Sequence, residues 1–281
     1  MERQPTAGDF RMSVLLRAEL AKLTYNKWLF VLIPALSAVY VWMIATHYRW
    51  NESLAWEQII RFPYSWGAVF QGLIVVFSLS PCFAQEHQAK TASLIFSTRN
   101  GRSLLTWAKI AASLLLITAI VIGFWAFNLT VNLGFAGMEG WDRPVQMLED
   151  YSKSPYSLFM WQYVLVQVAT NWIGCIAFAL LTLFLSACIR SYLTIFFISG
   201  LLFVMPFLIR NSSELSWTWL MKNGSMIEPM RVTNLFNRSR YVEVGEWLLP
   251  LPLVAFYAYV VLLICLFLCG TVGRIKKKDV G

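Results

Sequence analysis

Side chains that could support acid–base, nucleophilic or metal chemistry are few and scattered in this sequence. The chain has two histidines, His47 and His87. They follow different apolar segments, so about 30 Å of hydrocarbon would separate them if those segments cross a membrane. Neither belongs to a His-Glu-x-x-His motif, so we expect no intramembrane metalloprotease. Cys265 and Cys269 lie one helical turn apart, but two cysteines alone do not make a zinc site. We therefore expect no metal site and no catalytic residue.

The sequence also lacks the phosphate-binding loop motif that commonly binds nucleotides. The fragment most similar to a phosphate-binding loop is Lys90-Thr91, which lacks the glycines whose backbone N–H groups cradle phosphates. If the chain is part of an active transporter, ATP must therefore be hydrolysed by another polypeptide. The net charge is +8, but no basic run is interleaved with aromatic residues as a nucleic-acid groove requires. We expect no nucleic-acid partner.

The polar side chains within the apolar segments are neutral. Four of them carry amides: Gln71, Asn128, Gln167 and Asn171. Gln167 and Asn171 are one helical turn apart, so they would share a helix face. One interpretation is a polar stripe along a translocation path. The simpler one is hydrogen bonding between helices, worth roughly 0.6 kcal/mol per bond on average, and both can hold together.

These residues lie in apolar segments long enough to cross a bilayer. Of the 281 residues, 58% are hydrophobic, whereas soluble domains contain about 45–50%. A span needs about 20 apolar residues, and it must be helical because lipid offers no partners to backbone N–H and C=O groups. The sequence therefore predicts an all-α integral membrane protein, with residues 1–281 as one domain. The six predicted transmembrane helices cover residues 28–46, 64–84, 110–132, 159–187, 193–209 and 248–270.

Basic residues predict the orientation of these spans. When residues 1–27 are placed in the cytoplasm, most Lys and Arg residues fall on the cytoplasmic side, as the positive-inside rule requires. Both termini and residues 85–109 are then cytoplasmic, and residues 210–247 form an extracytoplasmic loop. A basic cytoplasmic face would also attract anionic membrane lipids.

The N-terminal segment, residues 1–27, has an amphipathic pattern. Met12, Leu16, Leu20 and Leu23 recur at helical spacing and fall on one face. The pattern predicts a helix lying on the membrane surface before the first span. The alternative is a basic anchor that does not form a helix on the membrane surface.

The segment at residues 85–109 is expected to connect spans two and three through a short helix. The run from Glu86 to Phe96 is helical in pattern, and Asn100-Gly101 interrupts it. Such a helix would suit a groove on a soluble partner, since its apolar residues supply buried area and its charges set the register. The residues expected at this contact are Glu86, Lys90, Leu94, Ile95, Phe96, Arg99 and Arg102. The alternative is a solvated turn whose charges only satisfy the positive-inside rule.

In these features the chain resembles a bacterial permease of the ABC-2 type, the membrane subunit of an ABC exporter. The resemblance covers the whole architecture. It is most specific in Glu86 at the end of span two, the helix after it, the segment from Arg99 to Arg102, and Lys109 at the foot of span three. Glu19-Leu20-Ala21-Lys22 and Lys277-Lys278-Asp279-Val280 also match the family. The segment Arg99-Asn100-Gly101-Arg102 departs from it in lacking the proline often found there.

The resemblance implies a subunit of a transporter in the bacterial cytoplasmic membrane. Two permeases, identical or paralogous, would form the pathway. Separate ATPase subunits, which bind ATP and Mg, would dock on the coupling helices, so this chain would hold no cofactor of its own. The family exports peptides, lipids, glycans and drugs, and a hydrophobic or amphipathic cargo is expected here.

Two other classes remain open. One is a non-transporting membrane scaffold or immunity protein, which an ATPase gene beside this one would argue against. The other is a membrane enzyme, which would need acidic or nucleophilic residues gathered on one leaflet. The sequence shows no such cluster with recognisable spacing.

Overall fold

The computed structural model describes residues 7–50, 54–62, 66–88, 101–152, 154, 156–208, 241–244 and 247–276. Its α-helices are α1 (Ala7–Thr24), α2 (Lys27–Trp50), α3 (Ala55–Arg61), α4 (Ala68–Leu79), α5 (Pro81–Gln88), α7 (Gly101–Ala136), α8 (Met160–Cys188), α9 (Tyr192–Leu208) and α12 (Leu251–Lys276). Two 3-10 turns, η2 (Val145–Met147) and η3 (Glu149–Tyr151), and two strands, β1 (Tyr241–Val244) and β2 (Trp247–Pro250), complete the described elements.

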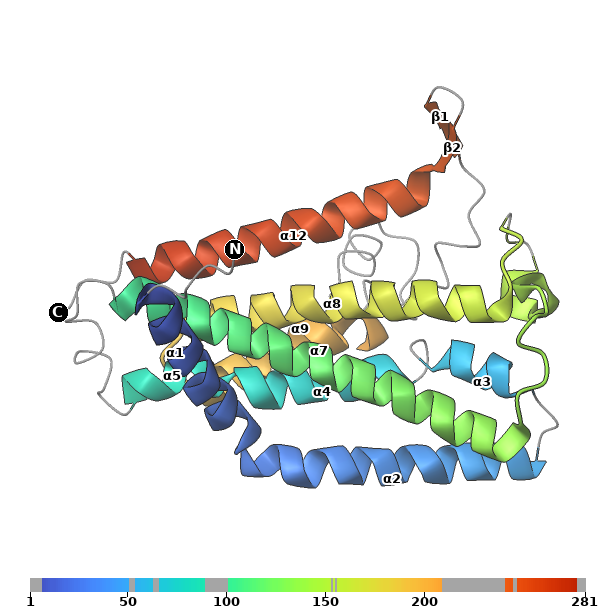
Figure 1. The fold of residues 1–281 in the computed structure, drawn as a ribbon, viewed down its shortest axis with the longest axis horizontal. Coiled ribbons are helices and arrows are strands. Elements are labelled where there is room, and N and C mark those ends of the chain that lie inside the picture. The colour runs from blue at the N-terminus through green and yellow to red at the C-terminus, as the bar shows by residue number, and fades with distance from the viewer. Residues whose placement is uncertain are drawn as a thin grey trace.

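The long helices run side by side in one bundle, with α1 and α5 at one end and α3 towards the other (Figure 1). We call these the α1 end and the α3 end. Five helical segments are long and apolar enough to cross a membrane: 27–49, 68–85, 103–136, 160–188 and 256–275. The chain is therefore a multi-pass helical membrane protein. The helix α9 is apolar but shorter, so the expected count of six spans stays a prediction.

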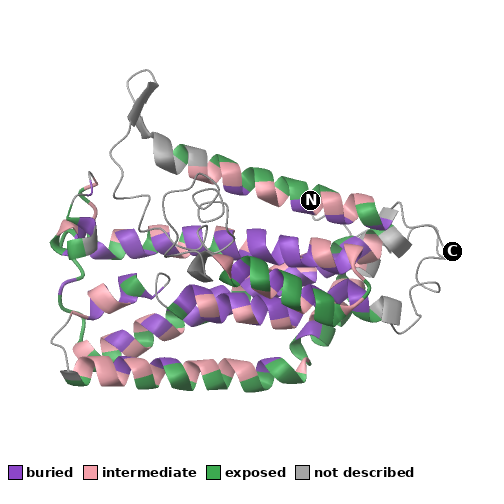
Figure 2. Cartoon of the chain, turned by 180° about the vertical axis from the view of Figure 1, so that it is seen from behind, coloured by how far each residue is buried: buried purple, intermediate pink, exposed green. Residues whose placement is uncertain are grey.

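Burial separates central from peripheral helices. Most of α4 and α8 is buried, whereas α2 and α12 lie at the outside of the bundle (Figure 2). The side chains exposed on the peripheral helices are large and apolar, including Phe30, Trp42, Val261 and Leu262. Exposed apolar faces of this extent suit contact with lipid chains, which are as apolar as leucine.

Glycines allow two close helix contacts. A Cβ added at Gly72 of α4 would lie 2.3 Å from Cζ of Phe203 in α9, and one added at Gly270 of α12 would lie 2.8 Å from Cε2 of Phe184 in α8. Each glycine thus leaves the space that an aromatic ring of the neighbouring helix occupies. Small residues at helix interfaces serve the same purpose in membrane proteins generally.

The structure has a helix within the predicted N-terminal segment. The helix α1 covers Ala7–Thr24, and its Leu16, Leu20 and Leu23 pack against the hydrophobic core of the bundle. These leucines are part of the apolar face found in the sequence. That face therefore packs, at least in these three residues, on the other helices of the chain. A location of α1 on the membrane surface stays a prediction.

Two features of the segments between spans are absent from the sequence prediction. The first is α3, which folds back against α7 and α8 from the expected outer loop between spans one and two, with Ile59 and Ile60 fully buried. The second is an antiparallel hairpin in which Tyr241 pairs with Pro250 and Val244 with Trp247. The hairpin occupies the end of the expected 210–247 loop and the first residues of the expected sixth span.

Candidate functional site

The first candidate site is a break in the second span, between α4 and α5. Pro81 begins α5 and has no backbone N–H, so it cannot donate the helical hydrogen bond to the carbonyl of Phe77. The side-chain amide of Asn26, between α1 and α2, donates to that carbonyl over 3.4 Å. The Asn26 side chain thus supplies a donor to a carbonyl that has lost its helical hydrogen bond.

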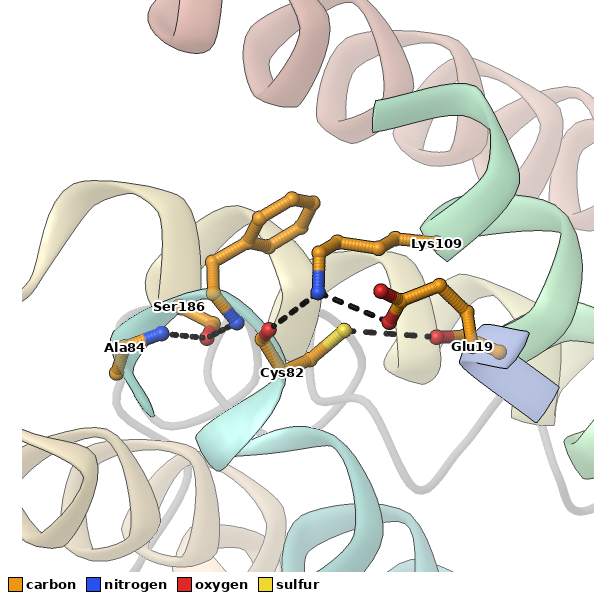
Figure 3. Close-up of polar contacts among 7 residues, drawn as sticks. Glu19, Cys82, Ala84, Lys109 and Ser186 are labelled. Carbon is orange, nitrogen blue, oxygen red and sulfur yellow. Dashed lines mark hydrogen bonds and ion pairs between the residues drawn. The ribbon is translucent and has the colours of Figure 1, made fainter. Parts of the chain in front are cut away.

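The hydroxyl of Ser186 in α8 bridges the same break. It donates to the carbonyl of Ser80 over 3.0 Å and accepts from the backbone N–H groups of Phe83 at 3.0 Å and Ala84 at 3.3 Å. In an uninterrupted helix, the N–H of Ala84 would donate to Ser80 directly. Ser186 therefore replaces a helical hydrogen bond with a link from the second span to α8 (Figure 3).

Lys109 of α7 ties the same region to α1. Its ammonium group donates to the carboxylate of Glu19 over 3.0 Å and to the carbonyl of Cys82 over 3.1 Å, and it lies over the ring of Phe83. The Lys109 side chain is 1% exposed. A buried ammonium must be paired and hydrogen-bonded to be tolerated, and these three contacts meet that need (Figure 3).

We call Glu19, Ser80, Cys82, Lys109 and Ser186 the junction cluster. It joins α1, the α4–α5 break, α7 and α8 at the α1 end of the bundle. The helices α5 and α7 flank residues 89–100, which hold most of the expected docking contact. The junction cluster thus links four elements through hydrogen bonds and one ion pair.

Most of the expected docking residues lie outside the described residues: Lys90, Leu94, Ile95, Phe96 and Arg99. Glu86 is in the last turn of α5 and Arg102 is in the first turn of α7. The expected coupling helix and its contacts therefore stay predictions.

The expected translocation-path residues lie inside the bundle, where two of them meet at the end of α3. The amide of Asn128 in α7 donates to the carbonyl of Ile59 over 3.3 Å, and that of Gln167 in α8 donates to the carbonyl of Ile60 over 3.0 Å. The last carbonyls of any helix lack helical donors. Gln167 supplies a buried partner to the carbonyl of Ile60. Asn128 adds a second donor to the carbonyl of Ile59, which also accepts from the backbone N–H of Phe62 over 3.4 Å.

A larger polar network surrounds Asn128. The amide of Asn132 donates to the side-chain oxygen of Asn128 over 2.8 Å and to the hydroxyl of Tyr40 over 2.9 Å. Tyr40 itself donates to the Asn128 side chain, and the hydroxyl of Tyr48 donates to Asn132 over 3.1 Å. The network fixes α2 against α7 and so supports the residue that caps α3.

The other two expected path residues also join helices. Asn171 of α8 accepts from the indole N–H of Trp125 in α7 over 3.0 Å, and the thiol of Cys175 in α8 donates to the side-chain oxygen of Gln71 in α4 over 3.4 Å. All four amide side chains are buried and each makes an interhelical hydrogen bond. Among the residues that the structure describes, the amide nitrogen of Gln71 has no hydrogen-bond partner.

Sequence reasoning missed the roles of Ser186, Asn26 and α3. The signal for the break was Pro81 within an apolar run, because proline interrupts a helix. The signal for α3 was the apolar spacing of Ala55, Trp56, Ile59 and Ile60, with Glu57 and Arg61 four residues apart. Nothing in the sequence linked Ser186 to the break, because the two are about a hundred residues apart.

Within the described residues, no group of three or more His, Cys, Asp or Glu side chains could hold a metal ion. Compared with known proteins, the chain matches no family model, no curated protein and no solved structure. The functional interpretation therefore depends on the residues and their geometry.

Proposed function

We propose that this chain is the permease subunit of an ATP-driven transporter of the ABC-2 type, in the bacterial cytoplasmic membrane. A separate ATPase subunit binds ATP and Mg and docks on residues 86–102. A second permease, identical or paralogous, completes the pathway. The cargo is hydrophobic or amphipathic and is exported.

The observation that best supports the proposal is the junction cluster. A coupling segment can move the spans only if it is attached to them rigidly. Ser186 attaches α5 to α8, and Lys109 attaches the start of α7 to α1 and to the α4–α5 break. Both ends of segment 89–100 thus join parts of the bundle that are locked together. A loop without such attachments would absorb the movement of a partner.

The buried charges favour ATP hydrolysis by a separate subunit over an ion gradient as the energy source. Intramembrane ionisable residues mark proton relays and ion-coupled transport. In the part of the chain that the structure describes, Lys109 is the charged side chain buried in the bundle, and Glu19 neutralises it. A paired charge at one end of the bundle does not form a relay across it.

The distribution of charge supports the cytoplasmic placement of the α1 end. Described basic residues that gather there are Arg11, Arg17, Lys22, Lys27, Arg102, Lys109, Arg190, Arg274 and Lys276. The α3 end carries acidic residues, among them Glu57, Glu139, Asp142 and Glu149, and fewer described basic ones, namely Arg49, Arg61 and Arg143. By the positive-inside rule, this asymmetry supports a cytoplasmic location for the proposed docking segment.

The test is co-purification of this chain with a co-expressed candidate ABC ATPase subunit. We expect Leu94→Asp and Ile95→Asp to remove the ATPase from the purified complex, because a charge would replace apolar contact area. Glu86→Ala should weaken the binding of the ATPase or uncouple ATP hydrolysis from transport. All three variants should insert into the membrane as the wild type does, and the chain alone should show no ATPase activity.

The matched control is Met147→Asp, an equally drastic change at an exposed residue of the α3 end. It should leave ATPase binding unchanged. Retention of the ATPase and of transport in all three docking variants would show the assignment to be wrong. Failure of the wild-type chain to bind any ATPase would favour the scaffold interpretation.

A further inference from the structure

A cavity of about 710 Å³ opens at the α1 end, between α1, α2, the α4–α5 break and α9. Its size falls within the range of about 300–1,000 Å³ typical of ligand sites. The lining is divided by chemistry. One part is polar and comes from Lys22, Asn26 and Gln85; the other is aromatic and comes from Trp28, Phe77, Phe196 and Phe197.

The aromatic part is a continuous wall. The ring centroids of Phe77 and Phe196 are 4.8 Å apart, those of Trp28 and Phe77 are 6.3 Å apart, and those of Phe196 and Phe197 are 5.7 Å apart. Trp28 and Phe197 remain largely exposed. Rings that pack on one side and stay open on the other offer apolar area to a further ligand.

The position of the cavity matches the boundary between water and hydrocarbon. The apolar span of α2 begins at Lys27, directly after the polar lining residue Asn26. Tryptophan is common at this level of the membrane, and Trp28 is there. Lys22 and Asn26 thus precede the apolar span of α2, Trp28 lies at its start, and Gln85 is the last residue of the span that covers α4.

The described lining of the cavity contains one residue of each charge. Among the described residues that line the cavity, Glu19 is acidic and Lys22 is basic. The Glu19 carboxylate is already paired with Lys109 at 3.0 Å, so it does not repel an anion as an unpaired acid would. Lys22 is the described basic residue of the lining, and its ammonium group can pair with an anion.

From these features we propose that the cavity binds an anionic phospholipid of the surrounding membrane. The phosphate headgroup lies at Lys22, and an acyl chain lies along the wall of Trp28, Phe77, Phe196 and Phe197. This site does not depend on the proposed transport function, because it needs only the membrane position of the α1 end. A bound lipid would fill the space between α9 and the α4–α5 break.

The test is native mass spectrometry of the detergent-purified protein, titrated with phosphatidylglycerol and with phosphatidylcholine of identical acyl chains. We expect tighter binding of phosphatidylglycerol. Lys22→Gln should lower its affinity about fivefold, the equivalent of about 1 kcal/mol for one lysine near a membrane surface, and leave phosphatidylcholine unchanged. Phe197→Ala should weaken both lipids, because it shortens the apolar wall.

Lys27→Gln is the matched control, since Lys27 is a nearby basic residue that does not line the cavity. It should have little effect, and an equal loss in the two lysine variants would overturn the proposal in favour of general surface charge. Equal binding of the two wild-type lipids would also overturn it. Millimolar glycerol 3-phosphate should not displace the lipid; displacement would mean that the site binds a free phosphate compound. Size-exclusion profiles establish that each variant is folded.

Discussion

At the scale of single residues, the Ser186 hydroxyl satisfies three backbone groups of the α4–α5 break at once. Ser186→Ala would leave these buried groups without that partner, at about 1–3 kcal/mol per unsatisfied group. We expect a clearly lower melting temperature. Ser199→Ala is the control, because the Ser199 hydroxyl is also buried but bonds only within its own helix. Equal effects of the two substitutions would contradict the bridging role of Ser186.

Melting can be followed with a thiol-reactive dye, because the thiols of Cys82 and Cys175 are reduced and buried in the folded protein. Unfolding exposes both of them and increases the dye signal. The same assay serves for the next prediction, and neither cysteine is changed in either experiment.

The pair of Glu19 and Lys109 is the second prediction at this scale. Glu19→Gln leaves a buried ammonium without its counter-charge, which costs about 3–5 kcal/mol for a buried pair. The double variant Glu19→Gln with Lys109→Met removes both charges and should be more stable than Glu19→Gln alone. Glu57→Gln is the control, since its partner Arg61 is largely exposed and such pairs contribute about 0–1 kcal/mol. A double variant less stable than Glu19→Gln alone would contradict the charge argument.

At the scale of elements, α3 has only seven residues, so few hydrogen bonds within the helix hold it in place. Its last carbonyls lie inside the protein and need partners there. Gln167 donates to the carbonyl of Ile60, and Asn128 donates to that of Ile59, which also accepts from the backbone N–H of Phe62. Substitution of both amide residues by leucine should release the end of α3 from α7 and α8. The helix would then expose Ile59, which is fully buried in the folded protein.

That release can be measured with Ile59→Cys and a membrane-impermeant maleimide. Labelling should be slow in the otherwise unchanged protein and about eightfold faster with Asn128→Leu and Gln167→Leu together, because two anchoring bonds of about 0.6 kcal/mol each are lost. Thr130→Val is the control, since the Thr130 hydroxyl of α7 bonds only within its helix. Unchanged labelling in the double variant would mean that apolar packing alone holds α3.

At the scale of the whole molecule, exposed apolar faces and separated charges determine how the bundle sits in a membrane. The α1 end carries most of the described basic residues, so we expect it to face the cytoplasm. Reporter fusions at Gly281 and within the loop at Gly140 test this orientation. A cytoplasmic signal at Gly281 and an extracytoplasmic one at Gly140 are expected, and a cytoplasmic signal at Gly140 would contradict the arrangement.

The sequence by itself determined the class of the protein and the approximate positions of its spans. Apolar runs of sufficient length must become helices in lipid, whatever the rest of the chain does, so α2, α7 and α8 are found where the runs predicted them. It also identified Gln71, Asn128, Gln167 and Asn171 as unusual, because neutral amides are rare in such runs. Hydrogen bonding between helices, the simpler interpretation, describes the contacts that each of them makes.

Only the tertiary structure decided which groups these side chains contact. Ser186 meets the break at Ser80, Lys109 meets Glu19, and Gln167 meets the carbonyl of Ile60. Each pair is separated by ninety or more residues of sequence, and local patterns depend only on neighbours within a turn or two. Which helices become neighbours depends on packing, as at Gly72 beneath Phe203. The junction cluster and the anchoring of α3 therefore exist only once the whole bundle has assembled.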